Sequence, residues 1–110
     1  LGGVFPYMVG RINDCFHTYS ADHGYYPLPK EPSEYYREQV WDDAISFHLP
    51  AMKCALEFMG ADHLLIGTDY AHPIGGPDKV ARFVNDLGLS QEDTEKIFYK
   101  NAMKLFNIEA

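Results

Sequence analysis

The sequence lacks clustered basic residues, long apolar runs and low-complexity tracts. It carries 9 Lys and Arg against 16 Asp and Glu, so the formal net charge is −7. Nucleic-acid phosphates require clustered Lys and Arg, and this charge balance therefore argues against a nucleic-acid partner. No apolar run approaches the roughly 20 residues of a membrane span, so we expect no membrane association.

Cysteine is also scarce. Cys15 and Cys54 lie far apart and form neither a CxxC motif nor a zinc-knuckle spacing. We therefore expect two buried, reduced thiols in a cytoplasmic protein, in preference to a disulfide. No signal peptide is visible, and the chain opens at Leu1 without a Met, so we expect the natural N-terminus to lie upstream.

The residues that are present indicate one globular domain over 1–110 with an alternation of helices and strands. Hydrophobic residues make up 46% of the 110 residues, enough for a core. Apolar periodicity, proline starts and glycine stops predict the following elements. Helices are expected at 6–19, 32–38, 50–59, 77–87, after Ser90 and, capped by Asn101, at 101–106, and strands at 40–46 and 64–68. Such βα material is typical of an α/β fold with a parallel sheet.

The most informative segment is the apolar strand that ends in Asp69. Leu64 to Ile66 forms a short buried run, and small residues, Gly67 and Thr68, follow where the chain must pass close to another part of the molecule. Ligands bind at the carboxyl ends of strands in α/β sheets, so an acid there is placed to hold a metal or to move a proton. On spacing alone, an Asp that caps the next turn is an equal alternative.

Short motifs follow one another along nearly the whole chain. They are Leu1–Tyr7, Gly10–Ile12, Pro32–Tyr35, Trp41–Asp43, Ser46–His48, Gly60–Tyr70 and Asn101–Phe106. In this order and spacing they resemble the C-terminal third of the metal-dependent amidohydrolases. The similarity is to the decarboxylase-like branch, which includes aminocarboxymuconate-semialdehyde decarboxylase and related aromatic-acid decarboxylases.

This resemblance implies a C-terminal fragment of a TIM (β/α)8 barrel, a fold that needs about 250 residues. The chain would supply the last two strands with their surrounding helices. In the family, a His that takes part in catalysis directly precedes the stretch that begins at Leu1, and the His ligands of the metal also lie upstream.

The resemblance also implies roles for particular residues. Asp69 matches the acid that closes the last barrel strand, where it binds Zn²⁺ or another divalent metal, or serves catalysis. Arg11 matches an Arg that grips a substrate carboxylate, sometimes in a neighbouring subunit's site; a surface salt bridge is the alternative. His72 stands where the decarboxylases have an aromatic residue, and it lines the pocket mouth or lies on the surface. Phe5 is expected to contact substrate or to pack in the core.

The remaining polar residues have weaker patterns. His48 precedes a proline and is expected to cap a helix or to lie behind the site, whereas His17, His23 and His63 are expected on the surface. Asp42 and Asp43 are neighbours on a strand, so their side chains face opposite ways and cannot act together as a dyad.

Two functions follow. The first is part of a metal-dependent enzyme that decarboxylates or hydrolyses a small carboxylated ring compound, with decarboxylation favoured by the Gly10–Arg11 match. The alternative is a non-catalytic truncated module without a metal, inactive because the upstream ligands are missing. For either, open sheet edges and an exposed apolar face predict a homo-oligomer.

Overall fold

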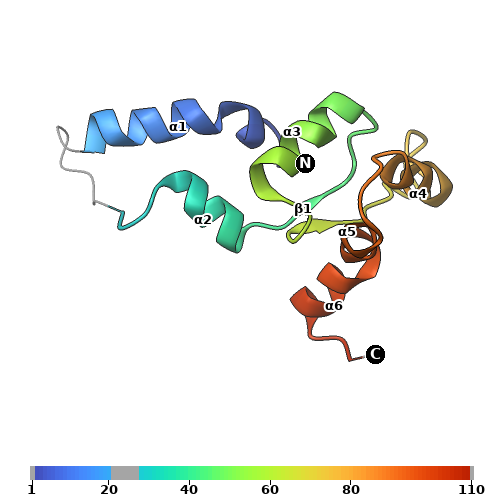
Figure 1. Ribbon diagram of the computed structural model, residues 1–110. Coiled ribbons are helices and arrows are strands. Elements are labelled where there is room, and N and C mark those ends of the chain that lie inside the picture. The colour runs from blue at the N-terminus through green and yellow to red at the C-terminus, as the bar shows by residue number, and fades with distance from the viewer. Residues whose placement is uncertain (1, 21–27, 110) are drawn as a thin grey trace.

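The computed structural model describes residues 2–20 and 28–109 as a mixed α/β chain in the predicted element order. Figure 1 shows this order along the ribbon. The elements are α1 (Phe5–Ser20), α2 (Pro32–Gln39), β1 (Asp42–Asp43), α3 (Leu49–Met59), β2 (Leu64–Leu65), α4 (Pro77–Asn85), α5 (Gln91–Glu95), the π-helical turn η1 (Lys96–Lys100) and α6 (Asn101–Phe106).

The two strands form a small parallel sheet, as predicted, but both are shorter than expected. Asp42 pairs with Leu64 and Asp43 with Leu65, and α3 makes the crossover between them. Ala44 N–H still donates to the Leu65 carbonyl at 2.9 Å, but the pairing ends there because the next two amides bond locally: Ile45 N–H donates to Asp43 Oδ1 at 2.8 Å and Ser46 N–H to the Ala44 carbonyl at 3.1 Å. β2 ends because Ile66 N–H donates to the carbonyl of Ile97 at 2.9 Å, outside the sheet.

Helix boundaries follow the proline and glycine punctuation of the sequence. Helices α2, α3 and α4 each carry Pro in the first turn. Backbone N–H groups there have no partner within the helix, so the missing N–H of proline costs no helical hydrogen bond. Gly60 ends α3 with a φ of +73°, a conformation that glycine adopts without a Cβ clash. Ser90 caps α5 by accepting a hydrogen bond from Asp93 N–H at 3.1 Å, which confirms the predicted helix start.

The core gathers around the sheet, between α3, α4 and η1. Its largest fully buried side chains are Met52, Leu64, Val80, Val84 and Ile97. Helix α1 contributes no buried residue, although its apolar side chains have helical spacing. This helix therefore presents an apolar face that other parts of the described chain cover only in part.

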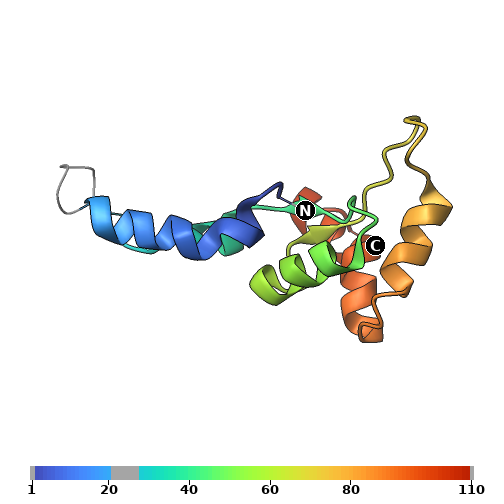
Figure 2. The same cartoon turned by 90° about the horizontal axis from the view of Figure 1, so that it is seen from above.

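The molecule is elongated, and α1 and α4 lie on opposite sides of the sheet. Figures 1 and 2 show α1 and α2 extending from the sheet on one side and α4 and α5 on the other, with α6 next to the sheet. The radius of gyration is 16.1 Å. A compact domain of this length has about 13 Å. Such a shape leaves much apolar surface in water.

The sequence predicted that Asn101 caps a separate final helix, but no separate helix begins at this residue. The backbone from Gln91 to Phe106 is continuously helical through the π turn η1. The Asn101 side chain is buried and its amide donates to the carbonyls of Ala61 and Leu64, at 2.7 Å each. The residue therefore fastens this helical run to the start of β2.

The cysteines are unpaired, as expected, but the prediction that both are buried is wrong. Cys15 is half-buried and Cys54 is exposed. Cys15 lies on α1, which other elements cover only in part, and Cys54 lies on the solvent-exposed side of α3. Among the described residues, no helix combines the length and the apolar character that crossing a membrane demands.

Candidate metal and substrate site

Asp69 lies four residues beyond β2, at the carboxyl end of the sheet. Its side chain is exposed, and its backbone has a φ of +52°, in the left-handed region that residues with a Cβ rarely occupy. The loop from Ile66 to Gly76 carries it between β2 and α4. A carboxylate at the end of a parallel strand is in the place that α/β proteins use for ligands.

The loop folds back on Asp69 and holds its backbone. His72 N–H donates to the Asp69 carbonyl at 2.6 Å, and Gly76 N–H donates to the Thr68 carbonyl at 2.8 Å. A Cβ at Gly75 would lie 2.6 Å from Asp69 Cβ, so only glycine allows this close return. The unusual backbone of Asp69 is therefore fixed by its own loop.

Gly67 makes the close approach that its position predicted. A Cβ there would meet Ile45 Cδ1 at 2.6 Å and Asp43 Cβ at 3.2 Å. The chain leaving β2 thus runs directly against the chain leaving β1. Asp43 is exposed and Asp42 is buried, which confirms that the two side chains face opposite ways.

The described residues do not supply a complete set of metal ligands. Within 2–20 and 28–109, no group of three His, Cys, Asp or Glu side chains is close enough to hold an ion. Divalent ions in proteins take several such ligands, and one exposed carboxylate does not hold one alone. Asp69 therefore fits a metal only as a member of a set that includes ligands from outside the described residues.

Arg11 is not brought near Asp69 within this chain. It lies on the exposed face of α1, beside a depression lined also by Asp14, Cys15 and Tyr19. Both views place α1 on the opposite side of the sheet from the β2–α4 loop (Figures 1 and 2). A shared site would need this arginine to come from a second copy.

Phe5 packs in an aromatic cluster. Its ring stacks on Tyr36 at 3.9 Å between centroids and lies 5.9 Å from Phe58. The Tyr36 hydroxyl donates to buried Asp42 at 2.9 Å. Partial burial of the phenol, and to a smaller extent this hydrogen bond, raises the pKa of Tyr36 to about 12. Contact between Phe5 and a substrate stays a prediction.

Gly2 packs onto the Tyr36–Asp42 pair. It has a φ of +66°, and a Cβ there would collide with the Tyr36 hydroxyl and lie 2.5 Å from Asp42 Oδ2. The Tyr36–Asp42 pair therefore restricts the path of the backbone just before α1.

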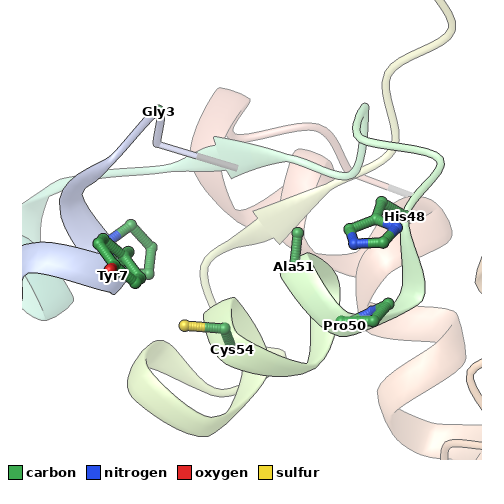
Figure 3. A pocket seen from close by; sticks show the side chains of 7 residues that line it. Gly3, Tyr7, His48, Pro50, Ala51 and Cys54 are labelled. Atoms are coloured by element: carbon green, nitrogen blue, oxygen red, sulfur yellow. The ribbon is translucent and has the colours of Figure 1, made fainter.

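A cavity of about 310 Å³ separates the first turns of α1 and α3. Figure 3 shows Tyr7 from α1 facing Ala51 and Cys54 of α3, with His48 at the far end. His48 is the N-cap residue of α3 as expected, but its side chain makes no capping hydrogen bond. The walls are mostly apolar, so the cavity offers shape and few polar contacts.

The other histidines are placed as follows. His72 is exposed on the β2–α4 loop, three residues from Asp69. His17 is exposed and contacts Glu31 at 2.6 Å, as the surface prediction requires. His63 is half-buried, so the surface prediction is wrong for it; its ring stacks on Trp41 at 4.3 Å and its Nδ1 contacts the Val40 carbonyl. His23 lies outside the described residues.

One contact near the site could not be found from the sequence. Phe47, in the β1–α3 loop, has a φ of +53°, and Lys79, in the first turn of α4, places its Nζ 3.8 Å from the Phe47 ring centroid. Phe47 belongs to the Ser46–His48 piece of the family pattern, but no motif or spacing indicates its contact with Lys79, because the two residues are far apart in the sequence.

Comparison with known proteins places the chain. The amidohydrolase family model matches residues 5–108. The 2-amino-3-carboxymuconate-6-semialdehyde decarboxylase of Caenorhabditis elegans is 27% identical over 98% of this chain, which covers 26% of that protein. The chain thus spans about a quarter of this relative's length.

Solved structures of similar proteins agree in fold. A variant of 5-carboxyvanillate decarboxylase from Novosphingobium aromaticivorans, with bound manganese and a nitrobenzoic acid, has a TM-score of 0.82 and 25% identity; 97% of this chain and 31% of that chain are covered. A dihydroxybenzoic acid decarboxylase from Polaromonas, with bound manganese and 2-nitroresorcinol, has a TM-score of 0.77 and 26% identity, covering 99% and 32%. Because the family model matches nearly the whole sequence, the chain belongs to the amidohydrolase family.

Proposed function

We propose that this chain is the C-terminal part of a metal-dependent decarboxylase that acts on a small carboxylated aromatic ring. It supplies the last two strands of a (β/α)8 barrel, β1 and β2, with their helices. The observation that carries the proposal is the position of Asp69 at the carboxyl end of β2, where TIM-barrel enzymes place their active-site residues. The decarboxylases similar to this chain support the reaction class.

Asp69 contributes one carboxylate oxygen ligand in this proposal. The remaining ligands come from outside the described residues, since these hold no group of three candidate ligands. A bound divalent ion supplies a fixed positive charge and Lewis acidity. Manganese is preferred to zinc because two similar decarboxylase structures contain manganese and a carboxylate suits this ion.

Arg11 binds the substrate carboxylate in a neighbouring copy. A guanidinium forms two parallel hydrogen bonds with a carboxylate, and Arg11 is exposed and free to reach across a subunit boundary. His72, on the loop that carries Asp69, lies at the mouth of the site, where it contacts the ring or its substituents. This division of labour requires a homo-oligomer.

The test is metal content and decarboxylation by the full-length protein that carries this chain. The substrate is 2,6-dihydroxybenzoate, the ligand in one related decarboxylase structure. Asp69→Asn is expected to lose manganese and activity together, whereas Asp86→Asn, at an exposed acid on the end of α4, keeps both. Full activity and manganese content in Asp69→Asn would contradict the proposal.

Arg11 needs a separate measurement. Arg11→Lys is expected to raise KM for the carboxylated substrate at least about tenfold, because an ammonium cannot form the paired hydrogen bonds. Mixing Arg11→Lys with Asp69→Asn subunits is expected to restore part of the activity. When one subunit of each kind pairs, one of the two shared sites contains both Asp69 and Arg11. No recovery on mixing would contradict the placement of Arg11 in a neighbour's site.

A second candidate, a non-catalytic module, applies to the 110 residues alone. It is favoured by the lack of a group of three candidate ligands among the described residues and by apolar side chains left in water, such as Val4 and Tyr7 at 64% and 80% exposure. Manganese titration of the isolated chain tests the module: no retained metal is expected, and stoichiometric metal that depends on Asp69 contradicts it.

A further inference from the structure

We propose that Lys79 is a positioning residue that fixes Asp69 by fastening the two loops at the carboxyl end of the sheet. The inference rests on the proposed function for its consequence in metal binding. The contact itself is independent of that function. One lysine side chain touches both the β1–α3 loop and the β2–α4 loop.

The first contact is with the loop that carries Asp69. Lys79 Nζ donates to the Ile74 carbonyl at 2.8 Å. Ile74 immediately precedes Gly75, whose backbone lies against Asp69, and Gly76, whose N–H bonds to Thr68. Holding the Ile74 carbonyl therefore holds the returning arm of the loop against Asp69.

The second contact is with the neighbouring loop. The Lys79 ammonium lies 3.8 Å from the centroid of the Phe47 ring, close enough for a cation–π interaction. The same ring packs edge-on against buried Phe83 at 6.1 Å. Since Phe83 belongs to the core, the Phe47 ring links the Lys79 ammonium to the buried part of the molecule.

Each of the two loops contains a residue whose backbone conformation depends on the contacts around it. Phe47 and Asp69 each have positive φ, at +53° and +52°, although neither is glycine. Such conformations persist only where surrounding contacts hold them. The Lys79 ammonium contacts the Ile74 carbonyl and the Phe47 ring, and these groups belong to the loops that carry the two residues.

The test uses the full-length protein with Lys79→Met, which keeps the aliphatic stem and removes the ammonium. Lys53→Met, at an exposed lysine on α3, is the matched control. Hydrogen exchange of the metal-free protein is measured at the His72 and Gly76 amides, which bond to Asp69 and Thr68. We expect Lys79→Met to accelerate both about tenfold, through local opening, and Lys53→Met to leave them unchanged.

A second measurement concerns the metal. Lys79→Met is expected to raise the dissociation constant for Mn²⁺ about tenfold, the lower range for loss of a residue that orients a ligand. Lys79→Arg restores most of the affinity, because a guanidinium also donates to a carbonyl and stacks on an aromatic ring. Phe47→Leu is expected to have a similar effect that does not add to that of Lys79→Met.

The outcomes separate the two proposals. Unchanged exchange in Lys79→Met, or equal acceleration in Lys53→Met, overturns the inference. Faster exchange with unchanged Mn²⁺ affinity also overturns it, because Asp69 would not depend on the fastening. If the wild-type protein binds no Mn²⁺, the proposed function fails, and faster exchange at His72 still supports the positioning of Asp69 by Lys79.

Discussion

At the residue scale, the site is shaped by two glycines at which an added Cβ atom would not fit. Gly67 lies against Asp43, the last residue of β1, and Gly75 lies against Asp69, in the loop that follows β2. Neither position needs a positive φ, so the requirement is for space alone. These glycines let the chains leaving β1 and β2 run side by side and bring Asp69 to the sheet's edge.

Gly67→Ala is therefore expected to destabilise the protein by about 1 to 3 kcal/mol through overpacking against Ile45 and Asp43. Gly10→Ala is the matched control, because nothing lies within 4 Å of the added Cβ and the position is inside helix α1. The control is expected to stabilise by up to about 1 kcal/mol. Urea denaturation measures both, and equal midpoints for the two variants would contradict the prediction.

Tyr36 gives a pH dependence at the same scale. Its pKa in the folded protein is about 12 against an ordinary value of 10.0, so folding favours the protonated phenol. The associated stability is present below pH 10 and is lost as the pH rises toward 12. Tyr36→Phe is expected to remove this part of the alkaline loss.

The measurement is thermal unfolding at pH 9 to 12. Tyr7→Phe, which alters a phenol that is 80% exposed, serves as the control and is expected to keep the wild-type loss. An alkaline transition in Tyr36→Phe as steep as in the wild type would show that another group is responsible.

At the scale of elements, the helical run from Gln91 to Phe106 is organised by its polar side chains. Ser90 caps its start, Lys96 pairs with Asp62 at 3.0 Å and Asp93 at 3.1 Å, and Asn101 bonds to the carbonyls before and within β2. The hydrogen bond with Lys96, then that with Ser90, lowers the pKa of Asp93. Together they attach the C-terminal helices to the strand that leads to Asp69.

Asn101→Ala is expected to cost about 1 to 3 kcal/mol, because the Leu64 carbonyl loses its bond from the Asn101 amide, whereas the Ala61 carbonyl keeps a bond from Leu64 N–H at 3.4 Å. Asn85→Ala, at an exposed position on α4, is expected to change stability by less than about 0.5 kcal/mol. Chemical denaturation compares the two. If Asn101→Ala behaved like the control, water would be replacing the lost hydrogen bonds.

Ser90→Ala is expected to cost about 1 kcal/mol, the usual value for a lost N-cap. The variant also loses one of the two bonds that lower the pKa of Asp93, so this pKa is expected to rise. NMR titration of the Asp93 carboxyl measures the pKa. Ser46→Ala, at a half-buried serine outside any helix, is the control, and a cap that contributes nothing would give equal stabilities.

At the scale of the whole molecule, the chain has a core on one side of its sheet and open apolar surface elsewhere. Within the described residues the sheet has two strands, so each strand has one edge without a strand partner. Side chains such as Tyr7, Tyr70 and Phe106 are 80%, 81% and 64% exposed. Unpaired edges and apolar patches favour association with further strands or further copies.

The isolated 110-residue chain is therefore expected to self-associate. Light scattering after size exclusion is expected to give a mass above that of one chain, and the mass should rise with concentration. Co-expression with the other strands of the proposed barrel is expected to replace this mixture with one defined species. A stable monomer of the isolated chain at every concentration would contradict the expected self-association.

The sequence by itself determined the order of the elements and the place of Asp69. Apolar periodicity, proline starts and glycine stops are local properties, so Gly60, Ser90 and the parallel pair of strands were predictable. The close approach at Gly67 was predictable as well, because small residues beside a buried strand have few other causes. The motifs spread along the chain carried the family.

Only the tertiary structure decided which residues meet across the sequence. The bond from Asn101 to β2, the stacking of His63 on Trp41 and the bridge from Lys79 to Phe47 each join distant segments. Local pattern says nothing about such partners, and it predicted a cap for Asn101 and a surface position for His63. Strand ends were likewise set by competing backbone bonds, because an amide bonds to whichever carbonyl the packed molecule brings to it.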